Sequence, residues 1–233
     1  MNHSDKNKRI WNNEYKNPVL VSEGSNPLKA VVEFVRFLKK KDVDVSAMSA
    51  LDIGSGTGRN SIYLSEHFDT VCGVDISDEA TRIAKNRARE VNSNAVFLCA
   101  SVAPKLPYGD ASFDVVIDTM VSHCLNTDDR MAYQSEIMRI IKPGGYWFVK
   151  TLGKTGDKNA KELISRFPGK DVDSYIMPEM GHQETVFTKE TFLEQYAKNF
   201  ELISYNEEAG YPSFNGRVYK RKFIEAILRK PLE

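Results

Sequence analysis

Cysteine is scarce in this sequence: 233 residues contain three, Cys72, Cys99 and Cys124, and no two of them form a C-x-x-C pair. Scattered single cysteines argue against a disulfide framework and against a metal site of the zinc type, and they fit a reducing cytosol. Long apolar runs are missing as well. No stretch approaches the ~18 apolar residues of a membrane-spanning helix, and the polar start lacks the apolar core of a signal peptide. We therefore expect a cytoplasmic protein with no membrane partner.

An excess of charge of either sign is also missing, because 32 Lys and Arg residues balance 32 Asp and Glu residues. Nucleic-acid binders usually carry a basic excess, so the composition argues against a nucleic-acid partner. The apolar fraction of 41% and the charged fraction of 27% are ordinary for globular proteins. We expect a single domain over residues 1–233, as a monomer or a homodimer.

The most informative stretch runs from Leu51 to Asn60 and reads LDIGSGTGRN. It predicts a strand that enters three glycines on alternate positions and then a helix. Glycine lets a ligand approach the backbone closely, and such a turn is where an open α/β sheet receives a nucleotide-like ligand. A second predicted strand, 70–75, ends in Asp75, about 20 residues past the glycines, where a carboxylate can accept hydrogen bonds from ribose hydroxyls. The ligand should contain a nucleoside.

The spacing of the glycines decides between two kinds of nucleoside ligand. A dinucleotide site would be G-x-G-x-x-G, with its third glycine where this chain has Arg59, whereas Gly58 makes the pattern G-x-G-x-G. Asp52, two residues before the first glycine, has no obvious use in a dinucleotide site. A nicotinamide-dependent oxidoreductase is therefore the weaker alternative, although it would keep the glycine turn and Asp75.

The segment LDIGSGTG closely resembles the cofactor motif of the class I S-adenosylmethionine (SAM)-dependent methyltransferases. The resemblance continues in the family's order through Asp75, through LPY at 106–108 with SFD at 112–114, and through KPGG at 142–145. It covers roughly residues 50–150. More loosely, GRNSIYL and the C-terminal tail are similar to the tellurite-resistance and thiopurine-type small-molecule methyltransferases. The resemblance implies a Rossmann-like, mostly parallel seven-stranded sheet with a final antiparallel hairpin and helices on both faces.

Hydrophobic periodicity independently predicts α/β alternation from residue 48 onward. Asn26 is expected to be the N-cap of the helix that follows it, with Pro27 at the first helical position. In the last expected strand basic residues alternate with apolar ones, which predicts a solvated face. The expected strands are 50–53, 70–75, 95–99, 113–117, 146–151, 201–206 and 217–228.

The resemblance implies a SAM site, with S-adenosylhomocysteine (SAH) as product. The loop backbone would meet the methionine carboxylate, Asp52 would hold the loop and the amino group, and Asp75 would bind the ribose. The third strand is not followed by the acid that family members commonly place near adenine, so Ser101 is expected to accept from the adenine amino group. The predicted cofactor-binding residues are Asp52, Gly54, Ser55, Gly56, Thr57, Gly58, Asp75, Ile76, Ser101, Val102 and Asp118.

Candidates for the acceptor side lie in three segments. Residues 1–47 are expected to form an N-terminal helical gate that includes Trp11 and Tyr15, and residues 152–187 a substrate-covering insertion that includes His182. His123 follows the fourth strand and is either a general base or substrate-orienting group, or a residue that only packs locally. These four residues are the predicted substrate contacts, and His123 is the predicted catalytic residue.

The predicted activity is direct in-line displacement of the SAM methyl group by a small-molecule nucleophile, which needs orientation and exclusion of water more than a base. Two alternatives keep the same cofactor motif. One is methylation of RNA, which the basic C-terminal residues would serve, although no Asn-Pro-Pro-Tyr or Asp-Pro-Pro-Tyr motif stands at 118–121. The other is a SAM-binding protein without catalysis.

Overall fold

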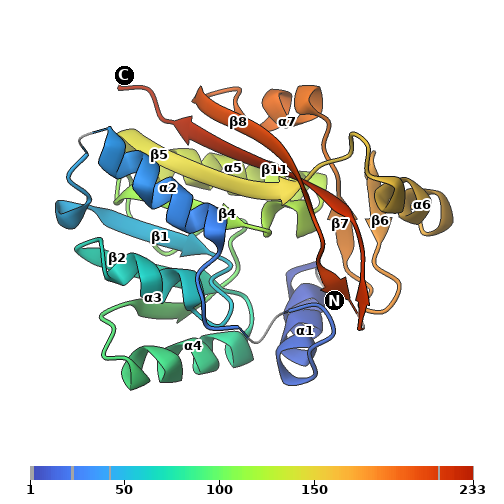
Figure 1. Ribbon diagram of the computed structural model, residues 1–233, viewed down its shortest axis with the longest axis horizontal. Helices are drawn as coiled ribbons and strands as arrows, with labels where there is room; N and C mark the ends of the chain where they lie inside the picture. The colour runs from blue at the N-terminus through green and yellow to red at the C-terminus, as the bar shows by residue number, and fades with distance from the viewer. Residues whose placement is uncertain (1–2, 22–23, 42, 215, 233) are drawn as a thin grey trace.

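A seven-stranded, mostly parallel sheet forms the centre of the molecule (Figure 1). The computed structural model describes residues 3–21, 24–41, 43–214 and 216–232. The strand order is β3-β2-β1-β4-β5-β11-β8, and β11 runs antiparallel to both of its neighbours. The strands are β1 Ser49–Ile53, β2 Thr70–Asp75, β3 Val96–Cys99, β4 Phe113–Thr119, β5 Ile141–Leu152, β8 Glu201–Gly210 and β11 Arg221–Arg229. This confirms the predicted fold.

Helices cover both faces of this sheet, which is why its central strands are apolar on both sides. On one face lie α2 (Lys29–Lys40), α3 (Arg59–Ser65) and α4 (Asp78–Glu90). On the other lie α5 (Thr127–Ile140) and α7 (Lys189–Tyr196), which lie behind the strands in Figure 1. Each face has its own buried cluster: α2 packs with residues of β1, β4 and β5, and α5 and α7 pack around Trp147.

Most of the helices begin after a residue whose side chain accepts a hydrogen bond from a backbone N–H of the first turn. The hydroxyl of Ser77 accepts from the backbone N–H of Ala80 at 3.1 Å, as expected for a cap of α4. The prediction for α2 was wrong, because its N-cap is Leu28 and not Asn26. The backbone is still extended at Leu28, with φ −63° and ψ 134°, so the helix begins at Lys29. The N–H of Leu28 instead donates to the side chain of Asn60 at 3.0 Å.

The end of the chain differs from the expectation. The expected strand 217–228 is divided: β10 (Arg217–Val218) pairs with β9 (Ser213–Phe214) in a separate hairpin, and β11 begins only at Arg221. Arg221 is buried and not on a solvated face. Its guanidinium donates to the Asp157 carboxylate at 2.9 Å. The alternation of basic and apolar residues along the chain gave no sign that this charge points inward.

Two further segments lie at the end of the sheet where the parallel strands finish. The helix α1 (His3–Lys16) lies below β11 in Figure 1, and residues 152–187 form α6 (Lys158–Arg166) and the two-stranded sheet of β6 (Ser174–Ile176) and β7 (Gln183–Thr185). Apolar side chains of residues 152–187, Leu152 among them, form a separate cluster with Phe214. Within the described ranges, no helix combines the length and apolar character that a membrane crossing requires.

Candidate functional site

Two positions in the glycine loop between β1 and α3 leave no room for a side chain. Gly54 and Gly56 have φ values of +63° and +54°, which disfavour any residue with a Cβ. A Cβ on Gly54 would lie 2.1 Å from Val121, and one on Gly56 would lie 2.7 Å from the Tyr15 hydroxyl. The loop backbone is therefore in close contact with the β4 loop on one side and with α1 on the other.

Asp75, at the end of β2, is tied to this loop. Its carboxylate accepts from the N–H of Gly56 at 2.9 Å and from the N–H of Ser77 at 2.8 Å. Burial raises the pKa of Asp75 to about 6, against the opposing effect of these two backbone bonds. Each carboxylate oxygen has more than one lone pair, so Asp75 retains the capacity to accept from hydroxyls of a ligand.

Asp52 lies behind the loop and has no exposed surface. One oxygen accepts from the Ser61 hydroxyl at 2.6 Å, whereas Oδ1 has no partner among the described residues. Burial raises its pKa to about 7, and the charge of Asp75 adds to that rise. Asp52 therefore holds α3 against β1, and the partnerless oxygen is the feature that could take a proton or a water.

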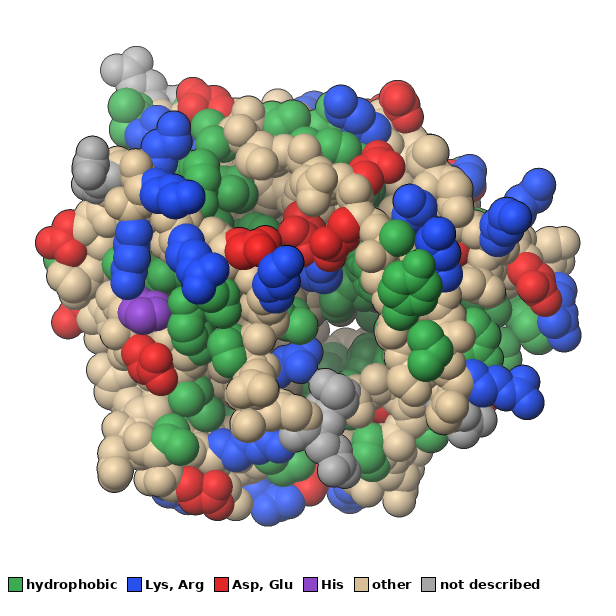
Figure 2. Space-filling view, in the orientation of Figure 1, with side chains coloured by type: hydrophobic (Ala, Val, Ile, Leu, Met, Phe, Trp, Pro, Cys, Tyr) green, Lys and Arg blue, Asp and Glu red, His purple; other side chains and the backbone are tan. Residues whose placement is uncertain are grey.

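One large cavity of about 1140 Å³ begins at the loop and continues past the end of the sheet. On the space-filling surface this face is hollowed, with hydrophobic side chains visible inside the opening (Figure 2). Eight of the predicted cofactor residues line the cavity: Gly54, Ser55, Gly56, Thr57, Asp75, Ile76, Ser101 and Val102. The Ser101 hydroxyl donates to the carbonyl of Ala103 at 2.7 Å and accepts from the N–H of Ala103 at 3.4 Å, which leaves one lone pair available to an adenine amino group.

Three predicted cofactor residues do not line the cavity: Asp52, Gly58 and Asp118. Asp118 is instead part of a buried hydrogen-bond network. Its carboxylate accepts from the N–H of Val121 at 3.0 Å and from the Tyr133 hydroxyl at 2.9 Å. Asp118 thus orders the turn after β4. Gly58 is the N-cap of α3 and packs against Phe97.

The helix α1 covers the cofactor end of the cavity. Trp11 and Tyr15 line the wall, with ring centroids 6.5 Å apart. Asn12 accepts from the Ser77 hydroxyl at 2.7 Å, and Lys8 pairs with Asp78 at 2.9 Å, so α1 is fastened to the start of α4. At its other end, one oxygen of Glu14 accepts from three consecutive N–H groups, those of residues 19–21, at 2.6–2.9 Å.

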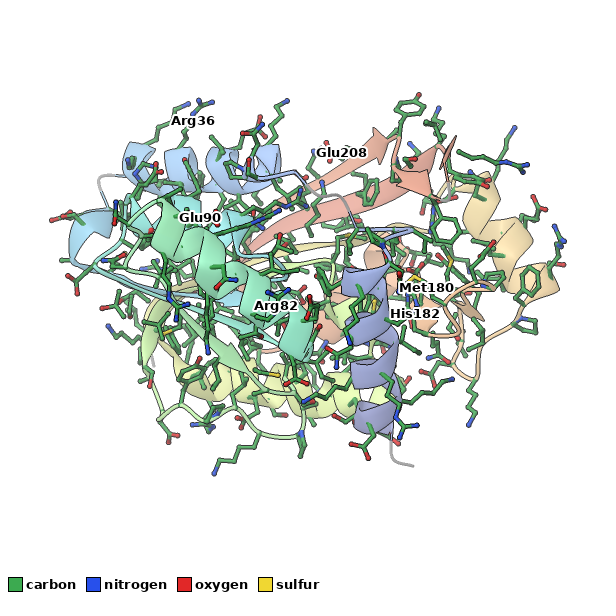
Figure 3. All side chains as sticks on the ribbon, turned by 90° about the horizontal axis from the view of Figure 1, so that it is seen from below. Arg36, Arg82, Glu90, Met180, His182 and Glu208 are labelled. Carbon is green, nitrogen blue, oxygen red and sulfur yellow. The ribbon has the colours of Figure 1, made fainter. Side chains whose placement is uncertain are left out.

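The predicted histidines meet in a buried polar cluster beside α1. His182 Nε2 contacts Glu184 Oε1 at 3.1 Å, and its ring lies against Trp11 with centroids 5.2 Å apart. In Figure 3, His182 and Met180 lie close to α1. His123 lines the cavity and His182 does not; His123 Nε2 is 3.9 Å from the same Glu184 oxygen. Burial lowers the pKa of His123 to about 4, so it is neutral near pH 7.

Sequence reasoning missed three members of this cluster. Glu184 also bonds the Tyr175 hydroxyl, which in turn accepts from Arg221 Nη2 at 2.8 Å. Burial alone would raise the pKa of Glu184, but the hydrogen bond and charge of His182, with the charge of Arg221, hold it below its usual range. The only signal in the sequence was the two-residue spacing of His182 and Glu184, which places them on one side of an extended segment.

Comparisons with known proteins agree with this geometry. Residues 51–149 match a family model described as a methyltransferase domain. The demethylmenaquinone methyltransferase of Oceanobacillus iheyensis is 38% identical over 100 residues, which covers 42% of this chain and 41% of that protein. The chain thus spans about two fifths of the length of such curated relatives, 38% in the case of a mycobacterial phthiotriol dimycocerosates methyltransferase.

Solved structures extend the likeness over most of the chain. A SAM-dependent methyltransferase of Methanosarcina mazei has a TM-score of 0.71 at 25% identity, covering 81% of this chain and 94% of that one. The 1,6-didemethyltoxoflavin-N1-methyltransferase of Burkholderia thailandensis, solved with its substrate and SAH, has a TM-score of 0.70 at 16% identity and covers 98% of this chain and 89% of that one. The second likeness concerns the fold alone. Taken with the strand order, the glycine loop and the position of Asp75, these matches identify residues 51–149 as a methyltransferase domain and show a SAM-dependent methyltransferase fold over most of the chain.

Proposed function

We propose that this protein transfers the methyl group of SAM to a small-molecule acceptor. The observation that carries the proposal is the single cavity of about 1140 Å³ that joins the glycine loop to a chamber beyond the sheet. Pockets for one drug-sized ligand usually measure ~300–1,000 Å³, so this cavity has room for a cofactor and a second molecule.

The two ends of the cavity have different chemistry. The loop end offers backbone N–H groups and the Asp75 carboxylate, which suit an amino-acid tail and a ribose. The far end includes the apolar side chains of Met120, Leu152, Met177 and Phe214, beside charged residues such as Arg166 and Glu179. The apolar part suits an acceptor with an aromatic or aliphatic body, and the relatives named for demethylmenaquinone and 1,6-didemethyltoxoflavin have acceptors of that kind.

The residues of this chain would act mainly by placement. Asp75 and the loop would fix SAM, α1 with Trp11 and Tyr15 would exclude water, and the segment 152–187 would hold the acceptor in line with the methyl group. His123 has a neutral imidazole at the wall of the chamber and would orient the acceptor or take its proton. The looser likeness to tellurite-resistance and thiopurine-type enzymes stays a prediction.

Calorimetry and a methyl-transfer assay together test the proposal. SAH should bind with one site per chain, and NAD⁺ at the same concentration should give no heat. Radiolabelled SAM should then methylate members of a panel of quinols, phenols, thiols and nitrogen heterocycles, and should leave transfer RNA unlabelled. Tight SAH binding without transfer to any panel member would favour a SAM-binding protein without catalysis, and labelled RNA would overturn the choice of acceptor.

A further inference from the structure

The wall of the acceptor chamber contains three metal-ligating groups that come from two distant segments. His123 and Cys124 lie in a short 3₁₀ turn after β4, and Glu184 lies on β7. One donor atom from each residue lies within 4.8 Å of the other two, and all three side chains are buried. All three residues also line the cavity.

Two of the three donor separations are close to those of ligands around one ion, and all three lie within 4.8 Å. His123 Nε2 lies 3.4 Å from Cys124 Sγ and 3.9 Å from Glu184 Oε1. In a tetrahedral zinc site with bond lengths of about 2.0–2.3 Å, ligand atoms lie about 3.4–3.6 Å apart. The separation of His123 and Glu184 is too long for a hydrogen bond, yet it is within a few tenths of an ångström of the separation that two ligands of one ion require.

The surroundings of Glu184 resemble the supporting shell of a metal ligand. Its two oxygens are bonded by His182 and Tyr175, Tyr175 is bonded by Arg221, and Arg221 is bonded by Asp157. Such partners orient a ligating carboxylate and hold it ionised. The charge of Arg221, which would oppose a cation, is paired with Asp157 at 2.9 Å.

Charge balance favours a divalent cation in the cluster. A bound divalent ion would match one carboxylate and one thiolate, and its binding would release the thiol proton. Soft thiolate and imidazole ligands select zinc-like ions over magnesium or calcium.

We propose that His123, Cys124 and Glu184 bind one zinc-type divalent ion, with its fourth coordination position open to the acceptor chamber. Three protein ligands with an open position are the arrangement of catalytic zinc sites, whereas structural sites are closed by four. The proposal replaces the expectation of no metal site that the scattered cysteines suggested.

Cobalt(II) titration of the chelator-treated protein of residues 1–233 tests the proposal, because Co²⁺ bound by a thiolate gives a charge-transfer absorption band. The double variant Cys72→Ser/Cys99→Ser leaves Cys124 as the only cysteine and does not alter the cluster. It should bind one Co²⁺ per chain with this band, and Zn²⁺ should displace the Co²⁺. Binding should strengthen as the pH rises from 6 to 8.

Variants in the cluster should lose this signal. Cys124→Ser should abolish the band and weaken binding about 100-fold, and Glu184→Gln should weaken binding at least tenfold while keeping the band. Far-UV circular dichroism should confirm that both variants are folded. Absence of the band in the double variant, which does not depend on the folding of cluster variants, would overturn the proposal, as would an unchanged band in Cys124→Ser. A failed search for methyl acceptors would leave this metal-binding result untouched.

Discussion

Replacing Asp52 with asparagine should make the stability of the protein depend differently on pH. In the folded, cofactor-free protein the pKa of Asp52 is raised by burial to about 7, against an ordinary value of 3.8. Between these two values the folded state holds a proton that the unfolded state has released. The free energy of unfolding therefore falls as the pH rises through this window, by about 1.4 kcal/mol per pH unit.

The size of the effect follows from the window. Between pH 4.5 and pH 8, the free energy of unfolding of the wild-type protein should fall by about 3 kcal/mol relative to that of a variant with no ionisable group at position 52. Asp52→Asn retains an oxygen for the Ser61 hydroxyl, but its amide NH₂ is buried without an acceptor, at a cost of about 1–3 kcal/mol at every pH. The variant should be less stable than wild type at pH 4.5 and more stable at pH 8.

Urea unfolding at pH 4.5, 6 and 8, without cofactor, measures this difference. Asp128→Asn is the matched control, because Asp128 is exposed in the first turn of α5 and its replacement should change stability by less than about 0.5 kcal/mol at each pH. If Asp52→Asn destabilises the protein equally at pH 4.5 and pH 8, Asp52 does not have a raised pKa, and the reasoning about the buried carboxyl fails.

Three other perturbations test the cofactor end of the cavity. The ionised carboxylate of Asp75 accepts from ribose hydroxyls more strongly than the protonated carboxyl, and its pKa is raised to about 6, so calorimetry should find SAH binding up to about tenfold weaker at pH 5 than at pH 7.5, with no such change in Asp75→Asn. Gly54→Ala places a Cβ 2.1 Å from Val121, whereas Gly181 has a similar positive φ of +76° but open space around it. In urea unfolding, Gly54→Ala should therefore lower the free energy of unfolding by at least about 2 kcal/mol more than Gly181→Ala does. Adding Val121→Ala should partly restore the stability of Gly54→Ala, and equal losses in the two glycine variants would contradict the steric argument. Glu14→Ala removes the acceptor of three N–H groups and should destabilise the protein by about 2–4 kcal/mol and speed SAH dissociation in stopped flow, whereas unchanged dissociation would mean that α1 does not cover the cofactor.

The sequence predicted the part of the site that is local in the chain. The strand, the alternate glycines and the strand-end acid Asp75 lie within 25 residues of one another, and their spacing determines a loop whose geometry is nearly independent of the rest of the fold. The same holds for the helix cap at Ser77. Asn26 shows the limit of such local rules, since the contact of Leu28 with Asn60 is a tertiary one.

The acceptor side could not be predicted, because its chemistry arises from contacts across long stretches of chain. Arg221 belongs to a strand whose alternation of basic and apolar residues is typical of a solvated face, and only the position of Asp157, 64 residues earlier, turns it inward. Cys124 forms no sequence motif with another ligand, and Glu184 reaches it only because β7 packs beside the turn after β4. Residue periodicity reports burial but does not report which buried polar groups meet.

The cofactor end and the acceptor end of the cavity are lined by different parts of the polypeptide. Substitutions at one end can therefore accumulate in evolution independently of substitutions at the other. Substitutions in residues 152–187 or in the β9–β10 hairpin can reshape the chamber without touching β1, β2 or the loop that they support. Acceptor preference can therefore diversify while the donor machinery stays fixed. Conversely, a fragment limited to residues 51–149 would carry the family signature, but β5 would have no β11 beside it, and little of the acceptor chamber beyond the turn after β4 would remain.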